Sequence, residues 1–362
     1  MVKVFIALIL FLFFACGGNS ESNKSADQPK ELNDLSKKEL SLLLDKYPDS
    51  IPLLQKRAEL SLDSLDYPQL MKDAAHAFRL DSNNTTSRLL YALALINKDK
   101  NTIQSSDFST ACYHFSKVLQ KDTSELRALV GMGSVFANLG NYDQAFVYVN
   151  KALRINPKYR DAYVLKGSMY LSKQNFTLAK SSYETAIKQD SKFFLGHLIL
   201  GSIYEHENNP LCIEYYTTAY QLEPKNPEII YALAYANEKF DRLKEAKRLY
   251  RLIAKVDSTY EMGYFHLGDI KQFKEKDLDS ALFFYSEAIE VNPKHIESYH
   301  NAGLAYEGKK QISNALFMYR KALEINPNYN ITLERVNALG KRRSWTYVSN
   351  DFLQRYCFQP LV

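Results

Sequence analysis

The sequence predicts an all-α fold, a solenoid of about eight antiparallel helix pairs that ends in a C-terminal capping helix. The first observation behind this prediction is a period: from residue 126 to residue 327, one pattern recurs every 33 to 35 residues. The second is the content of the pattern, because small residues, aromatic rings and a final proline or serine fall at matching offsets in each copy. The closing positions are Pro157, Ser191, Pro224, Ser258, Pro293 and Pro327.

Each part of the pattern has a physical role in this prediction. A glycine or alanine at the eighth position of the first helix lets the second helix approach closely. The aromatic rings are expected to fill the space between neighbouring pairs, and the closing proline ends the second helix because it cannot continue one. A single pair cannot bury its apolar face alone, so the pairs stack. The eighth positions are Gly133, Gly167, Gly201, Ala234, Gly268 and Gly303.

This pattern resembles the tetratricopeptide repeat, a helix-turn-helix unit of the same period. The resemblance implies a right-handed superhelical solenoid whose first helices line a concave groove for protein or peptide partners. It also implies which positions of each first helix face that groove. In the C-terminal repeats those positions hold Glu205, Glu228, Tyr231, Tyr235, Glu238, Phe265, Asp269, Gln272, Glu297, His300 and Glu307.

This half of the groove is expected to be acidic and lined by aromatic rings. Its acids are expected to be unopposed except by neighbours such as Lys239. Such a surface favours an extended or helical peptide with basic residues, through charge steering and aromatic anchors. The alternative is that these acids form an ordinary solvated helix face.

The N-terminus is expected to be an export signal. Lys3 precedes an apolar run from Val4 to Ala15, which is too short to span a bilayer comfortably and is typical of a signal peptide over residues 1–15. The small Ala15 directly before Cys16 resembles a bacterial lipobox. That resemblance implies cleavage before Cys16 and its lipidation by a diacylglycerol thioether and a further acyl chain such as palmitate, which together anchor stably. The alternative is an ordinary secretory signal with an incidental cysteine.

The residues after Cys16 suggest where the anchor lies. Gly17 replaces the aspartate typical of inner-membrane retention, so the resemblance implies the outer membrane. Cys16-Gly17-Gly18 followed by a polar segment resembles lipoproteins of the Bacteroidetes type. The segment from Asn19 to Lys24 is not an acidic export tag, which favours the periplasmic face.

The rest of the chain divides by composition and by the repeat. The polar residues 16–35 predict a flexible tether that stands the folded part off the membrane. A polar stretch, residues 98–106, lengthens one divergent repeat and predicts a long loop between its helices. The segments after the tether are divergent helical repeats at 36–125, clear repeats at 126–327, a capping helix at 328–343 and an unassigned tail at 344–362.

No motif in the sequence points to catalysis, a metal or a cofactor. C-x-x-C, H-E-x-x-H, Gly-rich phosphate loops and G-x-S-x-G are missing, so we expect no enzyme. A net charge of +5 is too small for a nucleic-acid protein of this length.

Four Asp-Ser-x tripeptides resemble an O-glycosylation signal and equally suit helix caps. They begin at Asp49, Asp63, Asp257 and Asp279.

These observations together predict a membrane-anchored scaffold that binds other envelope proteins or peptides through its groove. Two alternatives stay open: an accessory lipoprotein for glycan or peptide uptake, and a homo-oligomeric structural component.

Overall fold

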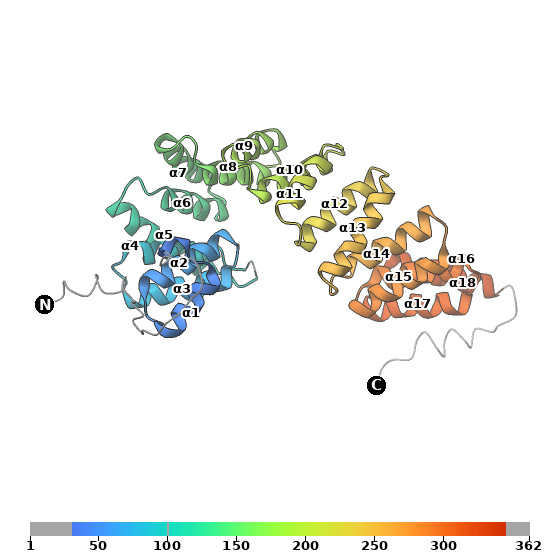
Figure 1. Cartoon of the computed structure of the whole chain (residues 1–362). Coiled ribbons are helices and arrows are strands. Elements are labelled where there is room, and N and C mark those ends of the chain that lie inside the picture. Colours follow the sequence, from blue (N-terminus) through green and yellow to red (C-terminus); the bar gives the residue numbers. More distant parts are fainter. Residues whose placement is uncertain (1–30, 100, 345–362) are drawn as a thin grey trace, which may run out of the picture. The chain divides into compact units, whose positions relative to one another are not determined.

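The computed structural model describes residues 31–99 and 101–344, and within these ranges the chain is all helical (Figure 1). Eighteen α-helices are present in the described ranges, and no residue there belongs to a strand. The predicted all-α fold is therefore confirmed. The chain divides into two compact units, the first ending at Thr123 and the second beginning at Ser124.

The first unit holds two helix pairs, α2 with α3 and α4 with α5, preceded by one further helix. Its helices are α1 (Lys37–Lys46), α2 (Ile51–Asp63), α3 (Tyr67–Leu80), α4 (Thr85–Ile96) and α5 (Ser105–Lys121). A capping box starts α1, in which Ser36 and Glu39 satisfy each other's backbone amides. Within the expected tether, Leu32–Asp34 instead form a 3₁₀ turn, and Asn33 accepts a 3.4 Å hydrogen bond from Lys56 Nζ.

The second unit holds six pairs that follow one another in chain order (Figure 1). The first two pairs are α6 (Leu126–Asn138) with α7 (Tyr142–Ile155) and α8 (Arg160–Ser172) with α9 (Phe176–Gln189). The next two are α10 (Phe194–His206) with α11 (Cys212–Leu222) and α12 (Pro227–Lys239) with α13 (Leu243–Val256). The last two are α14 (Met262–Asp269) with α15 (Leu278–Val291) and α16 (Ile296–Gly308) with α17 (Ile312–Ile325).

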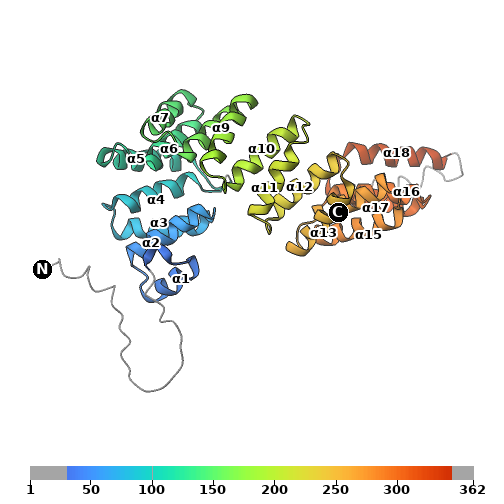
Figure 2. The same cartoon turned by 45° about the horizontal axis from the view of Figure 1, so that its top comes forward.

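A final helix, α18 (Asn330–Ser344), covers the end of the last pair (Figure 2). Its buried Leu339 and half-buried Val336 pack with Tyr319 of α17 and Tyr306 of α16. The helix thus shields apolar surface that a further repeat would otherwise bury.

Asparagine or aspartate ends most second helices. In the α7 copy, the Asn156 carboxamide accepts a 2.9 Å hydrogen bond from the backbone amide of Lys158, which is an Asx turn. The same bond forms at Asp190, Asp257, Asn292 and Asn326. The Asx turn does not require proline as the next residue. The second helices that precede Ser191 and Ser258 therefore end with the same turn as those that precede a proline.

The core of each pair is built on a close approach between its two helices. Second-helix alanines such as Ala281 and Ala315 are fully buried. A methyl group added at Gly303 would lie less than 3.0 Å from three ring carbons of Tyr319. The same contact joins Gly167 with Tyr183, Gly201 with Tyr216 and Gly268 with Tyr285.

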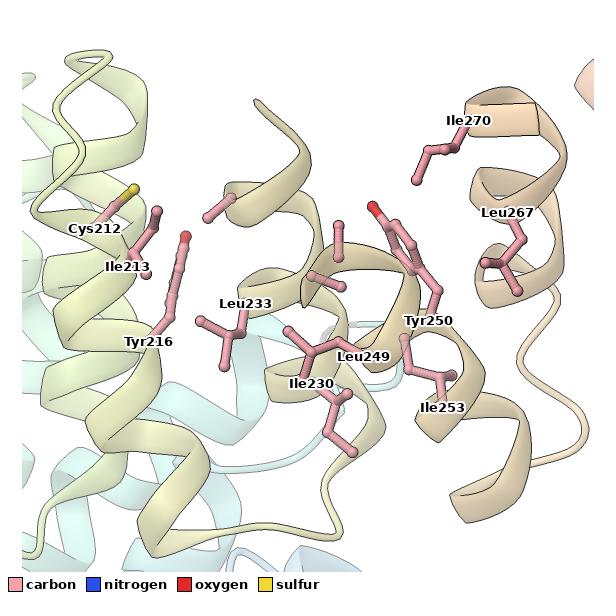
Figure 3. Packing of buried hydrophobic residues seen from close by; sticks show 13 residues of the cluster. Cys212, Ile213, Tyr216, Ile230, Leu233, Leu249, Tyr250, Ile253, Leu267 and Ile270 are labelled. Atoms are coloured by element: carbon pink, nitrogen blue, oxygen red, sulfur yellow. The ribbon is translucent and has the colours of Figure 1, made fainter. Parts of the chain in front are cut away.

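The placement of these second-helix rings corrects the sequence prediction. They were expected between neighbouring pairs, but they lie inside their own pair, over the glycine of the first helix. Figure 3 shows Tyr216 on α11 and Tyr250 on α13, with Ile230 and Leu233 of α12 between them. Rings at other positions do bridge pairs, as Tyr170 of α8 contacts Phe146 of α7 at 5.4 Å between centroids.

The close approach predicts opposite behaviour for two helical glycines. We expect Gly303→Val to lower the free energy of unfolding by about 1–3 kcal/mol, because the added methyl groups overlap the Tyr319 ring. Gly340 of α18 has no atom within 4 Å of an added Cβ, so Gly340→Val should stay within about 0.5 kcal/mol of the native protein. Urea unfolding followed by circular dichroism measures both, and equal losses would contradict the packing described here.

Candidate functional site

The candidate site lies on the face formed by the first helices of the second unit, which we call the first-helix face. Helix α12 carries two exposed residues of this face, Glu228 and Tyr235. The Asn226 side chain caps this helix by accepting hydrogen bonds from the backbone amides of Glu228 and Ile229. Glu228, Tyr231 and Tyr235 then follow at spacings of three and four, so the three side chains share one side of the helix.

Four carboxylates near the ends of first helices accept hydrogen bonds from second-helix tyrosines of the same pair. We call this set the tyrosine–carboxylate ladder. Its bonds are Tyr216 to Glu205 at 2.8 Å, Tyr250 to Glu238 at 2.7 Å, Tyr285 to Asp269 at 2.7 Å and Tyr319 to Glu307 at 2.9 Å. Each buried hydroxyl thereby gains the acceptor that burial requires.

Three ladder carboxylates also contact a polar side chain that follows later in the chain, two from the next first helix and one from the final helix α18. His266 Nδ1 lies 3.1 Å from Glu238 Oε2, and Asn301 Nδ2 donates to Asp269 Oδ1 at 2.7 Å. Arg335 of α18 donates to both oxygens of Glu307, at 2.6 and 3.2 Å. These bonds therefore join two of the pairs to the next pair, and the last pair to α18, in addition to the bond within each pair.

Two carboxyl groups of the ladder have pKa values shifted in opposite directions. Burial alone would raise the pKa of Glu238, but the hydrogen bonds from His266 and Tyr250 outweigh it and hold that pKa below its usual range. Burial dominates at Asp269, so its pKa is raised in spite of the bonds from Tyr285 and Asn301.

The expectation that the groove acids are unopposed is therefore wrong for Glu238, Asp269 and Glu307. Their charges are already met by donors within the protein. Glu205 is half-buried and bound by Tyr216, while the Lys239 ammonium donates to the backbone oxygen of Glu205. Whether any of these residues also contacts a partner stays a prediction.

Three further groove candidates are buried. Phe265 and His300 are only 9% and 6% exposed, and His300 Nδ1 lies 2.7 Å from Thr332 Oγ1. Burial lowers the pKa of His300. Gln272 is 6% exposed, and its Oε1 has no hydrogen-bond partner. These side chains belong to the core in this structure and not to the surface that a partner would touch.

The position of Gln272 follows from one extra residue in its repeat. One residue more separates Gly268 from Ala281 than separates Gly303 from Ala315. The chain absorbs it in a π-helical turn, η2 (Ile270–Lys274), which continues α14. Gln272 then takes the place of Glu238 and Glu307 in the pattern, and Asp269, one turn earlier, accepts the hydroxyl of Tyr285 instead.

What remains accessible is an aromatic cluster around α12. Tyr235 is 38% exposed, Tyr231 is half-buried and Glu228 is exposed. Tyr260, from the turn before α14, completes the cluster with its ring centroid 5.8 Å from that of Tyr231. The sequence analysis missed Tyr260 because it lies outside the first helices. Glu297 of α16 is also exposed, with its carboxylate 3.6 Å from His295.

The described ranges contain neither an assembled metal site nor a helix that could cross a membrane. No group of three or more histidine, cysteine, aspartate or glutamate side chains there is placed to hold a metal ion. None of the helices described is long and apolar enough to cross a membrane. Cys212 is buried, and burial raises the pKa of its thiol to about 11. The predicted lipidation site Cys16, the signal peptide and most of the tail lie outside the described residues.

Comparison with known families identifies four segments of the second unit. The model of the tetratricopeptide repeat family matches residues 126–159, 161–193, 263–295 and 296–329. These segments are tetratricopeptide repeats. The matches coincide with α6 to α9 and α14 to α17, whose spacing and small residues suggested the repeat.

Two curated proteins are similar over part of this chain. Protein O-mannosyl-transferase TMTC1 of Homo sapiens is 21% identical over 169 residues, covering 45% of this chain and 19% of its own length. Hsp70-Hsp90 organizing protein 2 of Arabidopsis thaliana is 20% identical over 229 residues, covering 53% of this chain and 40% of its own. The chain therefore spans between about a fifth and two fifths of these relatives.

Solved structures support the solenoid fold. The C-terminal part of a TPR repeat-containing protein from Cytophaga hutchinsonii superposes with a TM-score of 0.56. It is 18% identical, and the match covers 68% of this chain and 98% of that one. At this identity the comparison shows a shared fold and nothing of shared partners.

The two shifted carboxyl groups predict opposite effects of pH on stability. The folded protein holds a proton on Asp269 more tightly than the unfolded chain does, so the native advantage over Asp269→Asn should shrink as the pH rises above 3.8. The pKa of Glu238 is depressed on folding, so the native advantage over Glu238→Gln should be lost as the pH falls below 4.5.

Urea midpoints of the three proteins between pH 3.5 and pH 6.5 measure this difference, at values chosen to bracket the ordinary carboxyl range. Native-minus-variant differences that change in the same direction for both carboxyls would contradict the ladder geometry.

Proposed function

We propose that this protein is a non-catalytic scaffold of the bacterial cell envelope. It binds a basic protein or peptide on the first-helix face of its second unit, and the lipid on Cys16 holds it at the periplasmic face of the outer membrane. The tetratricopeptide repeats support protein binding, and one similar protein is named as an organizing protein for Hsp70 and Hsp90.

One observation carries this proposal: Glu228, which shares one side of α12 with the exposed Tyr235, forms no ion pair with a described lysine or arginine. Four other acids of this face already accept hydrogen bonds in the ladder, while Glu297 lies 3.6 Å from His295. An exposed carboxylate and an exposed tyrosine ring on the same side of one helix provide charge steering and an anchor for a basic segment. The rigid ladder fixes the first helices around it, which lowers the conformational cost of binding.

Charge reversal at Glu228 tests the binding surface. We expect Glu228→Lys to reduce capture of crosslinked envelope proteins at least fivefold, because it places a cation where the partner brings its own. Glu290→Lys is the matched control, since Glu290 is an exposed acid on the second helix α15. Quantitative mass spectrometry of the captured proteins measures the effect. Equal capture by native protein and Glu228→Lys would remove this face as the binding surface.

The lipid anchor generates a separate prediction. Cys16→Ser should move the protein from the membrane fraction to the soluble periplasmic fraction, because the acyl chains supply the membrane affinity. Cys112→Ser should leave the distribution unchanged, since its half-buried thiol lies in the folded helix α5. Detergent phase partitioning after cell fractionation measures both. A Cys16→Ser protein that still fractionates with membranes would exclude lipidation as the anchor.

A further inference from the structure

The aromatic cluster at α12 brings three tyrosine rings together. The rings of Tyr231 and Tyr235 are nearly parallel, with an interplanar angle of 22° and centroids 6.2 Å apart. Tyr260 is tilted by 52° against Tyr231 at 5.8 Å. The Tyr231 hydroxyl lies 3.1 Å from His266 Nε2, which fixes this ring in the cluster. Tyr235 is the most exposed ring of the three.

The surroundings of the cluster carry an excess of negative charge. Burial and the nearby carboxylates of Glu228, Glu261 and Asp257 raise the pKa of Tyr260. Asp257 accepts hydrogen bonds from Thr259, and Glu261 accepts one from the Asn292 amide at 2.8 Å. Those donors are neutral, and no described lysine or arginine forms an ion pair with any of the three acids.

Other aromatic rings of this protein carry a cation of their own. Lys180 lies 4.8 Å from the centroid of the Tyr204 ring, and Lys173 lies 4.9 Å from that of Tyr142. Arg88 over Phe78, Lys117 over Tyr113, Arg160 over Phe193 and Lys321 over Phe317 repeat this arrangement. In the described residues, no lysine or arginine lies over Tyr231, Tyr235 or Tyr260.

We infer that Tyr231, Tyr235, Tyr260 and Glu228 form a seat for an arginine side chain of the partner. The inference rests on the proposed function and deepens it by naming the group that this face recognises. A planar guanidinium stacks on the exposed ring of Tyr235, which the Tyr231 ring supports from behind, and its N–H groups donate to the Glu228 carboxylate. A lysine ammonium is expected to bind less tightly, because it is a compact, strongly hydrated charge. It cannot stack flat on an aromatic ring or donate two parallel hydrogen bonds to one carboxylate.

The probe is a capped pentapeptide of sequence Gly-Ser-Arg-Ser-Gly. Two matched peptides replace its arginine with citrulline, which keeps the shape without the charge, or with lysine. Binding to the full-length protein in detergent micelles is followed by ligand-observed saturation-transfer NMR, which suits weak complexes. We expect the arginine peptide to bind about threefold to tenfold more tightly than the lysine peptide, and the citrulline peptide to bind at least tenfold more weakly.

Conservative variants localise the binding. Tyr235→Leu and Glu228→Gln should each weaken binding of the arginine peptide about threefold to tenfold. Tyr113→Leu is the control, because Tyr113 is 55% exposed but already has Lys117 over its ring. Circular dichroism verifies that each variant is folded. Equal binding of the arginine and citrulline peptides, or unchanged binding by both cluster variants, would overturn the seat.

The peptide-binding experiment and the capture experiment distinguish a failure of the arginine seat from a failure of the proposed binding surface. If the arginine peptide fails to bind while Glu228→Lys still loses envelope partners, the seat is wrong and the binding surface stands. If the peptide binds as expected but capture does not depend on Glu228, the cluster recognises arginine and the first-helix face is not the surface that captures envelope proteins.

Discussion

The packing of a second-helix tyrosine against a small residue of the first helix is the contact on which the second unit depends. The ring can lie this close only because Gly201, Gly268 and Gly303 have no side chain. Burying a tyrosine also buries a hydroxyl, and a buried hydroxyl without a partner costs roughly 1–3 kcal/mol. A carboxylate on the first helix meets that need in four pairs, so apolar packing and the polar ladder are two parts of one arrangement.

The ladder decides which charges are left for function. A carboxylate that accepts a tyrosine hydroxyl and a donor from the next helix has little capacity to attract a partner. His266 of α14 and Arg335 of the final helix α18 also tie their helices to the preceding pair, since each contacts an acid of that pair. The carboxylates that a partner can reach are consequently those that lie outside the ladder. Glu228, at the start of α12, is such a carboxylate, and the tyrosines beside it make it distinctive.

The sequence predicted the helix pairs because each repeat position has one demanding requirement, such as a small residue under a ring. It could not predict how the acids are used, because the resemblance maps positions to a face and leaves their hydrogen-bond partners undefined. The period held a usable signal: Arg335 follows Glu307 at the same distance in the chain as His266 follows Glu238. Tyr260 gave no such signal, since it lies in a turn whose path depends on the packing around it.

The π turn explains why the face changes character after α12. Its extra residue moves the carboxylate that serves Tyr285 back by one turn, to Asp269, where burial is deeper and the pKa rises. The usual position then holds Gln272, a neutral side chain turned into the core. The surface of α14 therefore has no acid at this position. Glu228 of α12, and Asp257 and Glu261 of the turn before α14, still carry negative charge near Tyr260. The inserted residue thus leaves α14 without an exposed acid at this position of the repeat, while Glu228 on α12 and Glu297 on α16 stay exposed.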